Sequence, residues 1–257
     1  MKKNFVSIIT LAVMSVSCTR PISSCSDHLA EGKAPEFINQ KLAANTKLLC
    51  YEGYTVMHSG QTHTPLWSAE HLTTSSIHEA KQVEVSETFY AEPLLSDNER
   101  AELHDYNNAS LGRGQMATPI DMPTENAARG TFSLANVVPQ NQNNSRILWK
   151  GIEASARNFA RWDGEAYVIT GPIFEGSALQ RLNDRVLIPT ALFKAIYVPS
   201  RKAAGAYVAQ NNPGIQYQTV SIAELEKRIG LNLFPTMPAN IKEEKMNLHV
   251  PLLTKTN

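Results

Sequence analysis

We predict that this chain folds into one α+β domain, on the basis of two observations. Strand-like runs bounded by Gly, Pro, Asn and Ser residues recur along most of the chain, whereas helical periodicity is confined to a few segments. The chain has 257 residues, of which 42% are hydrophobic, so it can bury one sizeable core without a second domain.

The net charge of the chain is zero. A basic excess, which usually marks a nucleic-acid-binding protein, is therefore missing from the chain as a whole. Local basic positions would have to supply any affinity for phosphate.

Residues 1–17 have the pattern of an export signal. Two lysines precede an apolar run at 5–16, which is shorter than the roughly 20 apolar residues of a membrane span. Ser17-Cys18 also resembles a bacterial lipoprotein processing site, so acylation of Cys18 and simple cleavage of the leader are both open. We expect an exported protein that is periplasmic, anchored to the outer membrane as a lipoprotein, or secreted.

Cys25 and Cys50 remain as an even pair once Cys18 is acylated or removed. In an oxidising compartment such a pair tends to form a disulfide, which here would tie the N-terminal segment to the first strand. The alternative is that Cys50 is simply a small buried apolar residue. Residues 18–47 are polar with short apolar patches, and we predict an N-terminal arm rather than core.

From Leu48 onwards the chain alternates between strands and turns. A hairpin is predicted from strands at 48–57 and 65–72, joined by turn residues at 59–62. Further β-type runs predict strands at 131–138, 165–170, 185–189, 193–198 and 205–209.

Two helices follow from periodicity and capping. Apolar residues recur at helical spacing over 147–161. A second helix at 222–229 begins after Ser221, an N-cap residue, and ends at Gly230. Residues 239–257 are predicted to form a flexible tail.

The segment from Tyr106 to Glu153 gathers the residues with chemical potential. Arg113 stands between two glycines, a β-type run then carries Asn136, and an Asn/Gln-rich run leads into the helix with Glu153. Such a strand-loop-helix unit can bring polar groups around a divalent ion and a phosphate. The order of pieces resembles the active-site segment of the DNA/RNA non-specific endonucleases with a ββα-metal (His-Me) finger, the family that includes mitochondrial endonuclease G.

The resemblance extends over residues 48–238, through Thr170-Gly171-Pro172, a Pro-Thr-x-x-Phe-Lys segment at 189–194 and a closing Gly-Leu-x-Leu-Phe at 230–234. It implies a central antiparallel sheet flanked by helices. It also implies hydrolysis of DNA and RNA with Mg²⁺ or Mn²⁺, without base specificity, by a site that binds the phosphate backbone.

The family's first piece reads Asp-Arg-Gly-His, and here Gln115 stands in place of the histidine. Arg113 is expected to bind phosphate, since its flanking glycines allow close approach of a ligand. Gln115 has no basic pKa near neutrality and cannot take a proton, but its amide can accept a hydrogen bond from the attacking water. His104, close in sequence, is an alternative base.

Asn136 matches the family's asparagine that orients the catalytic group, although it could instead satisfy its own turn backbone. Ser145 aligns with the metal-binding asparagine, and Asn144 lies one place earlier; both carry oxygens acceptable to Mg²⁺. Ser145 could also merely cap the helix. Glu153 is expected to hold metal-bound water on the same helical face as Ser145, with Trp149 in the core.

We therefore predict an exported, metal-dependent endonuclease whose catalytic residues are Arg113, Gln115, Asn136 and Glu153. Its metal ligands are expected among Asn144, Ser145 and Glu153. The main alternative is a catalytically degenerate relative that binds nucleic acid or protein, and a weaker one is a hydrolase of another phosphodiester. The nuclease assignment requires that Arg113, Gln115 and Glu153 lie in one region of the fold.

Overall fold

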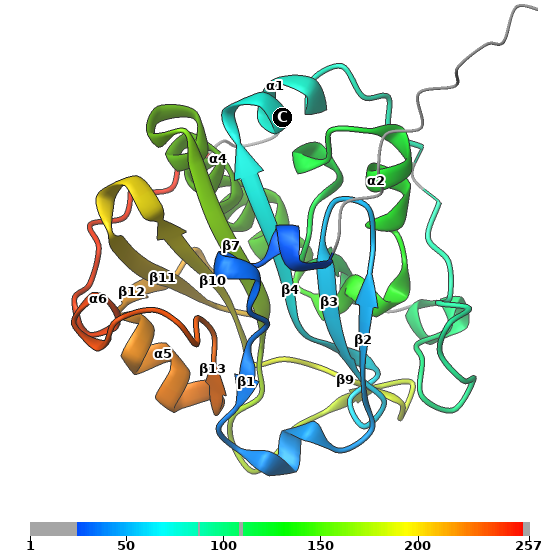
Figure 1. Cartoon of the computed structure of the whole chain (residues 1–257). Helices are drawn as coiled ribbons and strands as arrows, with labels where there is room; N and C mark the ends of the chain where they lie inside the picture. The colour runs from blue at the N-terminus through cyan, green and yellow to red at the C-terminus, as the bar shows by residue number, and fades with distance from the viewer. Residues whose placement is uncertain (1–24, 87, 108–109, 254–257) are drawn as a thin grey trace, which may run out of the picture.

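The centre of the molecule is a seven-stranded, fully antiparallel sheet, with the strand order β12-β11-β10-β7-β4-β3-β2 (Figure 1). The structure is a computed structural model and describes residues 25–86, 88–107 and 110–253. In chain order the strands of this sheet are β2 (Thr46–Cys50), β3 (Thr55–Ser59), β4 (Thr64–Thr73), β7 (Glu165–Ile173), β10 (Ala191–Val198), β11 (Ala203–Gln210) and β12 (Tyr217–Val220).

Three two-stranded antiparallel ribbons lie outside the main sheet. Their strands are β1 (Glu36–Phe37) with β13 (Leu231–Asn232), β5 (Gly112–Gln115) with β6 (Val137–Gln140), and β8 (Arg181–Leu182) with β9 (Val186–Leu187). The β5–β6 ribbon contains the Gly-flanked arginine.

The α-helices are α1 (Thr74–Ala80), α2 (Glu125–Gly130), α3 (Gln142–Asn144), α4 (Lys150–Asp163), α5 (Ile222–Ile229) and α6 (Ala239–Glu243), with a π-helical turn, η7 (Ser145–Trp149), between α3 and α4. Short 3₁₀ turns are η1 (Cys25–His28), η2 (Ala30–Gly32), η3 (Gln40–Ala43), η4 (Leu103–Tyr106), η5 (Pro119–Asp121), η6 (Leu134–Asn136) and η8 (Pro199–Arg201). Helix α5 is bounded as predicted, because Ser221 and Glu224 form a reciprocal capping box and Gly230 ends it with a φ of 73°.

Both faces of the sheet are covered, which confirms the predicted α+β architecture. On one face, Leu148, Ile152 and Phe159 from η7 and α4 share a buried cluster with Val168 and Ile196 from the sheet. The opposite face carries a second cluster that includes side chains of α5 and of the segment after it. Helix α4 therefore lies directly on the sheet, so its buried residues face the strands.

Three of the predicted strands differ from the structure. Of the run at 131–138, only Val137 and Val138 belong to a strand, β6. The run at 48–57 is two strands, β2 and β3, because the amide of Tyr51 donates to the carbonyl of Tyr54 and closes a turn around Gly53. The run at 185–189 contributes only Val186–Leu187, which pairs with β8 rather than with the sheet.

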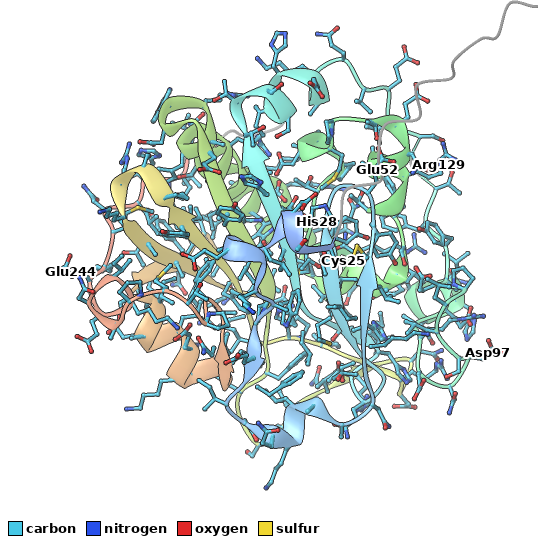
Figure 2. The ribbon with its side chains drawn as sticks, in the orientation of Figure 1. Cys25, His28, Glu52, Asp97, Arg129 and Glu244 are labelled. Carbon is cyan, nitrogen blue, oxygen red and sulfur yellow. A yellow bond between two sulfur atoms is a disulfide. The ribbon has the colours of Figure 1, made fainter. Side chains whose placement is uncertain are left out.

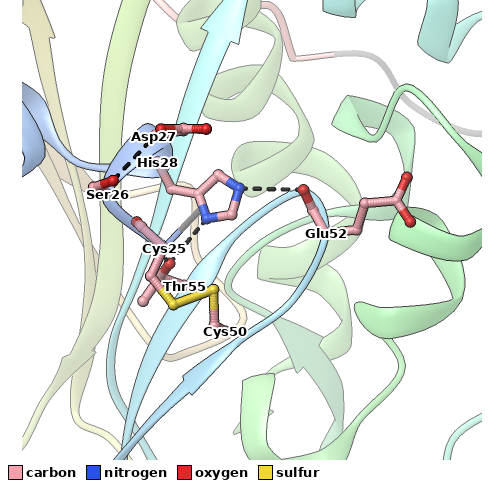
Figure 3. Close-up of a disulfide and its surroundings, with 7 residues drawn as sticks. All are labelled: Cys25, Ser26, Asp27, His28, Cys50, Glu52 and Thr55. Carbon is pink, nitrogen blue, oxygen red and sulfur yellow. Dashed lines mark hydrogen bonds between the residues drawn. A yellow bond between two sulfur atoms is a disulfide. The ribbon is translucent and has the colours of Figure 1, made fainter. Parts of the chain in front are cut away.

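The predicted Cys25–Cys50 disulfide is present and joins the N-terminal segment to β2 (Figure 3). Beside it, the ring of His28 makes hydrogen-bond contacts at 2.9 Å with Thr55 Oγ1 and at 3.2 Å with the carbonyl of Glu52. This segment is not a separate arm, because Leu29 and Ala30 are buried in the core. Cys25 and His28 lie over the sheet, whereas Asp97, Arg129 and Glu244 lie at the periphery (Figure 2).

The leader, including Cys18, lies outside the described residues. Within the ranges that the structure describes, no helix combines the length and apolar character needed to cross a membrane.

The C-terminal segment also differs from the prediction of a flexible tail, as far as residue 253. Met246 and Leu248 are buried with the α4 face of the sheet. The hydroxyl of Tyr207 donates to the carbonyl of His249 at 2.6 Å, and the His249 ring stacks on Phe159 at 4.1 Å. Spaced apolar side chains hold this segment on the domain, although its sequence lacks the periodicity of a helix or strand.

Candidate active site

The segment singled out from the sequence folds into a β-ribbon followed directly by a helix. Strand β5 pairs with β6 so that Arg113 lies opposite Pro139 and Gln115 opposite Val137. The chain then enters an almost continuous helical run from Gln142 to Asp163. Arg113 and Gln115 thus belong to the same ββα unit as the helix with Glu153.

A pocket of about 240 Å³ opens between the ribbon and the start of the helical run. Its lining residues are Gly112, Arg113, Gly114, Gln140, Gln142, Ser145 and Arg146. Two of the residues predicted from the sequence, Arg113 and Ser145, meet here. None of the described lining residues is acidic.

Arg113 is held by aromatic side chains. Its guanidinium carbon lies 5.2 Å from the centre of the Phe89 ring and 5.5 Å from that of Tyr106. Cation–π contacts of this kind hold a planar guanidinium without using its N–H donors. The buried Nε of Arg113 has no hydrogen-bond partner among the described residues, so the head group keeps donors for a ligand.

Gln115 is anchored through one end of its amide. Its Nε2 donates to the carbonyl of Thr131 at 3.0 Å and to the hydroxyl of Thr131 at 3.1 Å. Among the described residues no donor reaches its Oε1. Gln115 does not line the pocket with Arg113, but it is half-buried and keeps an acceptor for a water molecule.

Asn136 lies in η6, before the strand rather than at its end, because residues 131–136 do not form the predicted strand. Its side chain is fully buried, and both its Oδ1 and its Nδ2 make hydrogen bonds. The Oδ1 accepts from the Ser68 hydroxyl and the Ala117 amide, and the Nδ2 donates to the carbonyls of Ala117 and Thr131. Asn136 therefore fixes the same Thr131 carbonyl that receives Gln115, and it acts on the site indirectly.

The structure separates the two metal-ligand candidates. The side chain of Asn144 is buried, its Nδ2 donates to the carbonyl of Gln210 at 3.0 Å, and its Oδ1 accepts from Gln140 at 3.4 Å. Asn144 is thus committed to the fold and does not line the pocket. Ser145 is half-buried at the pocket wall, and its hydroxyl makes no hydrogen bond to any described residue.

The π-helical turn determines whether Ser145 and Glu153 lie on the same face of the helical run. The amide of Lys150 donates to the carbonyl of Ser145, five residues back, so this turn contains one extra residue. At about 100° per residue, an uninterrupted α-helix would place Ser145 and Glu153 about 80° apart around the axis. The extra residue reduces the difference to about 20°.

Gln140 is a pocket residue that was not predicted from the sequence. It is 1% exposed, and no described residue donates to its buried Oε1. A Cβ on Gly114 would stand 2.3 Å from this oxygen, so the glycine makes room for the amide. The sequence signal is the position itself, at the end of the Val-Val-Pro-Gln strand and opposite Gly112.

Glu153 does not line the pocket and lies in a cluster of buried charged groups between α4 and the sheet. Burial raises its pKa to about 7, against the lowering effect of Lys194 and Arg157. Trp149 is buried as predicted, and the Lys194 ammonium lies 5.7 Å from its ring centre.

Glu70 completes this cluster from β4. It is fully buried, and within the described ranges neither of its carboxylate oxygens has a hydrogen-bond partner. Burial raises its pKa well above the usual range, despite Lys194. Lys194 is also buried and donates to the Thr170 hydroxyl at 2.6 Å. Glu70 and Lys194 are charged residues within otherwise apolar strand runs, and this pattern could have pointed to both positions from the sequence.

His104 does not substitute for the missing imidazole in this geometry. Its side chain is 64% exposed, it lies 3.7 Å from the Asp105 carboxylate, and it does not line the pocket.

Residues 34–240 match the DNA/RNA non-specific endonuclease family. The chain belongs to this family. Mitochondrial nuclease EXOG of Danio rerio is 33% identical over 205 residues, which are 71% of this chain but only 59% of that relative. Nuclease C1 of Cunninghamella echinulata var. echinulata is 29% identical over 204 residues, covering 71% of this chain and 81% of that protein.

A solved structure of the EndoG/EndoGI complex has a chain that superposes with a TM-score of 0.69 at 22% identity. The match covers 77% of this chain and 89% of that one, and at this identity it concerns the fold alone.

This endonuclease family depends on a divalent metal ion. In the described ranges no cluster of three or more His, Cys, Asp or Glu residues could hold one. The pocket of this family member nevertheless offers the buried, unpaired Oε1 of Gln140 and the hydroxyl of Ser145. Neutral oxygens of this kind suit Mg²⁺, which keeps several waters and needs few protein ligands.

Proposed function

We propose that this chain is an endonuclease that hydrolyses phosphodiester bonds of DNA and RNA with a divalent ion, Mg²⁺ or Mn²⁺. The observation that carries the proposal is the pocket of the ββα unit, where Arg113, Gln140 and Ser145 meet in a chain of this family. An arginine with free donors and two neutral oxygens suit a phosphate and a hydrated cation.

Phosphodiester hydrolysis needs a nucleophilic water, positive charge near the phosphoryl oxygens, and stabilisation of the leaving 3′-oxygen. A bound divalent ion supplies charge at the phosphoryl and leaving oxygens. Gln140 and Ser145 are the residues that would hold it, and Glu153, on the same helical run as Ser145, would orient its water shell. Arg113 binds the phosphate through its guanidinium, already immobilised between two rings.

Gln115 orients the attacking water through its free Oε1 and takes no proton itself. The water must therefore lose its proton to solvent or to hydroxide. Activity is expected to rise towards alkaline pH without a bell-shaped optimum near neutrality.

The decisive assay is cleavage of plasmid DNA and of RNA with Mg²⁺, with Mn²⁺ and with a chelator. We expect cleavage with either metal and none with chelator. Gln115→His should raise the rate and introduce a titrating base, whereas Gln115→Ala should lower the rate without weakening oligonucleotide binding. A bell-shaped neutral profile in the unmodified protein would contradict the assigned role of Gln115.

The second candidate is a relative that binds the nucleic-acid backbone without cutting it. The observation in its favour is that the described pocket residues include no histidine or carboxylate that could take a proton from the attacking water. Oligonucleotide binding without cleavage in either metal would establish this alternative.

We also propose that the protein is exported, and that acylated Cys18 anchors it to a membrane. The Cys25–Cys50 disulfide supports an oxidising compartment. Cell fractionation of the full chain and of Cys18→Ser tests both points. Acylation predicts that the variant leaves the membrane fraction, and retention of the unmodified protein in the cytoplasm would overturn export.

A further inference from the structure

The pocket contains a second arginine, Arg146, which the family resemblance did not single out. It follows Ser145 directly in the π-helical turn, and its side chain is exposed at the pocket. Both arginines of the pocket are without a carboxylate partner among the described residues, and Arg146 donates no hydrogen bond to any of them.

Other arginines of the fold, such as Arg157, Arg185, Arg201 and Arg228, form ion pairs with an aspartate or glutamate. Arg113 and Arg146 differ from these four and line the same pocket. A concave surface with two unpaired guanidinium groups and no acidic lining residue carries a local charge of about +2, although the whole chain is neutral.

The buried atoms of the pocket are also incompletely satisfied. Among the described residues, the Nε of Arg113 lacks an acceptor and the Oε1 of Gln140 lacks a donor. Buried polar atoms normally have partners, so both indicate that a ligand completes the site. A phosphate oxygen can accept from the Arg113 Nε, whereas the Gln140 Oε1 needs a donor or a cation and supports the phosphate only indirectly.

We propose that Arg146 is a second phosphate-binding residue, and that Arg113 and Arg146 hold one backbone phosphate between them. Arg113 is the fixed half of this clamp, because two aromatic rings position it. Arg146 is the mobile half, since a long exposed side chain can fold onto a phosphate once it binds. Paired guanidinium groups make strong, charge-assisted bonds to phosphate oxygens.

The inference rests on the proposed function only in placing the nucleic-acid backbone in this pocket. In this proposal two arginine side chains bind the phosphate, and this binding does not depend on the missing histidine or on the metal. Binding can therefore be measured in a chelator, where no cleavage occurs.

The test uses the full chain and a labelled eight-nucleotide oligothymidylate, titrated by fluorescence anisotropy in EDTA at several NaCl concentrations. Arg146→Gln should weaken binding about tenfold at low salt and reduce the slope of log K against log salt by about 0.7, the value for one phosphate contact on a single strand. Arg113→Gln should have a similar effect. Arg146→Lys should keep the slope but lose part of the affinity, because lysine lacks the planar fork.

The matched control is Arg161→Gln. Arg161 is exposed on the same helical run and bonds only to Asn158, at 3.4 Å. It should change neither affinity nor slope. Inorganic phosphate should compete with the oligonucleotide, at about tenfold higher concentration in Arg146→Gln.

Equal slopes for Arg146→Gln and Arg161→Gln would overturn the proposal, and so would failure of the unmodified protein to bind in EDTA. If the slopes differ as expected and no metal supports cleavage, the phosphate clamp stands and the nuclease function fails. If cleavage occurs and Arg146→Gln binds normally, the nuclease function stands and the clamp fails.

Discussion

Substitution of Glu153 by glutamine should change how the stability of the metal-free protein depends on pH. Glu153 is 6% exposed, and burial raises its pKa from an ordinary 4.5 to about 7. The folded state therefore binds this proton more tightly than the unfolded chain does. The free energy of unfolding contributed by Glu153 is greatest below about pH 4.5 and falls as pH rises to about 7.

The magnitude follows from the size of the shift. Each pKa unit corresponds to about 1.4 kcal/mol, so a shift of about 2.5 units predicts a loss of about 3 kcal/mol across this interval. Glutamine has nearly the same shape and cannot ionise. The variant should therefore gain about 2.5 kcal/mol relative to the unmodified protein between pH 5 and pH 8.

Urea unfolding, followed by tryptophan fluorescence in EDTA at pH 5, 6, 7 and 8, measures this difference. His28, His58, His63 and His249 also titrate here, because burial lowers the pKa of each ring. Their contribution has the opposite sign, since the unfolded chain binds their protons more tightly and stability rises with pH towards about 6.5. It is present in both proteins and cancels in the difference.

A difference between the two proteins that stays constant from pH 5 to pH 8 would refute this reasoning. The loss of the charge partner of Lys194 and Arg157 gives an offset, whereas the pH dependence comes from the proton bound to Glu153, together with the effect of its charge on the neighbouring Glu70.

Three further substitutions test the surroundings of the site. Asn136→Ala removes four buried hydrogen bonds and should lower the free energy of unfolding by about 3 kcal/mol in urea titration. Gly114→Ala places a Cβ 2.6 Å from the Cβ of Gln140 and should cost about 2 kcal/mol and most of the cleavage activity. Leu248→Ala should lower the free energy of unfolding by about 2 kcal/mol, because this side chain of the C-terminal segment is buried against the α4 face of the sheet.

Each has a matched control. Asn143→Ala, the control for Asn136→Ala, removes an exposed asparagine side chain from α3. It should change the free energy of unfolding by less than about 0.5 kcal/mol. A Cβ in Gly112→Ala would lie 3.2 Å from the exposed Gln142 side chain and 3.7 Å from the Gln140 carbonyl oxygen, an ordinary contact, and should be tolerated. Leu252→Ala, at a position 72% exposed, should be nearly neutral. If a control costs as much as its test variant, the corresponding contact does not have the strength assigned to it.

The sequence predicted those features of the fold that depend on neighbouring residues. The Ser221 cap and Gly230 stop of α5 are local, and so is the apolar repeat of α4. Strands with strong β-type composition were predicted within a few residues of their ends, and the pairing of Cys25 with Cys50 followed from counting cysteines. The family resemblance then supplied the order in which these elements meet.

The candidate site was predicted only in part. Arg113 and Ser145 line one pocket, but the sequence could not choose between Asn144 and Ser145. That choice depends on the carbonyl of Gln210, which is 66 residues away and accepts a hydrogen bond from the side-chain amide of Asn144. The unpaired oxygen of Gln140 and the extra residue in the π-helical turn were equally invisible, because each depends on how the ribbon packs against the helix.

By itself, then, the sequence determined the elements, their caps and the chemical types available in the ββα unit. The tertiary structure alone decided which polar atoms are consumed by the fold and which remain for a ligand. It also decided that Glu153 is buried among charges and that the C-terminal segment is held on α4. The physical reason is that capping and periodicity act over a few residues, whereas burial and hydrogen-bond satisfaction depend on partners brought together from distant parts of the chain.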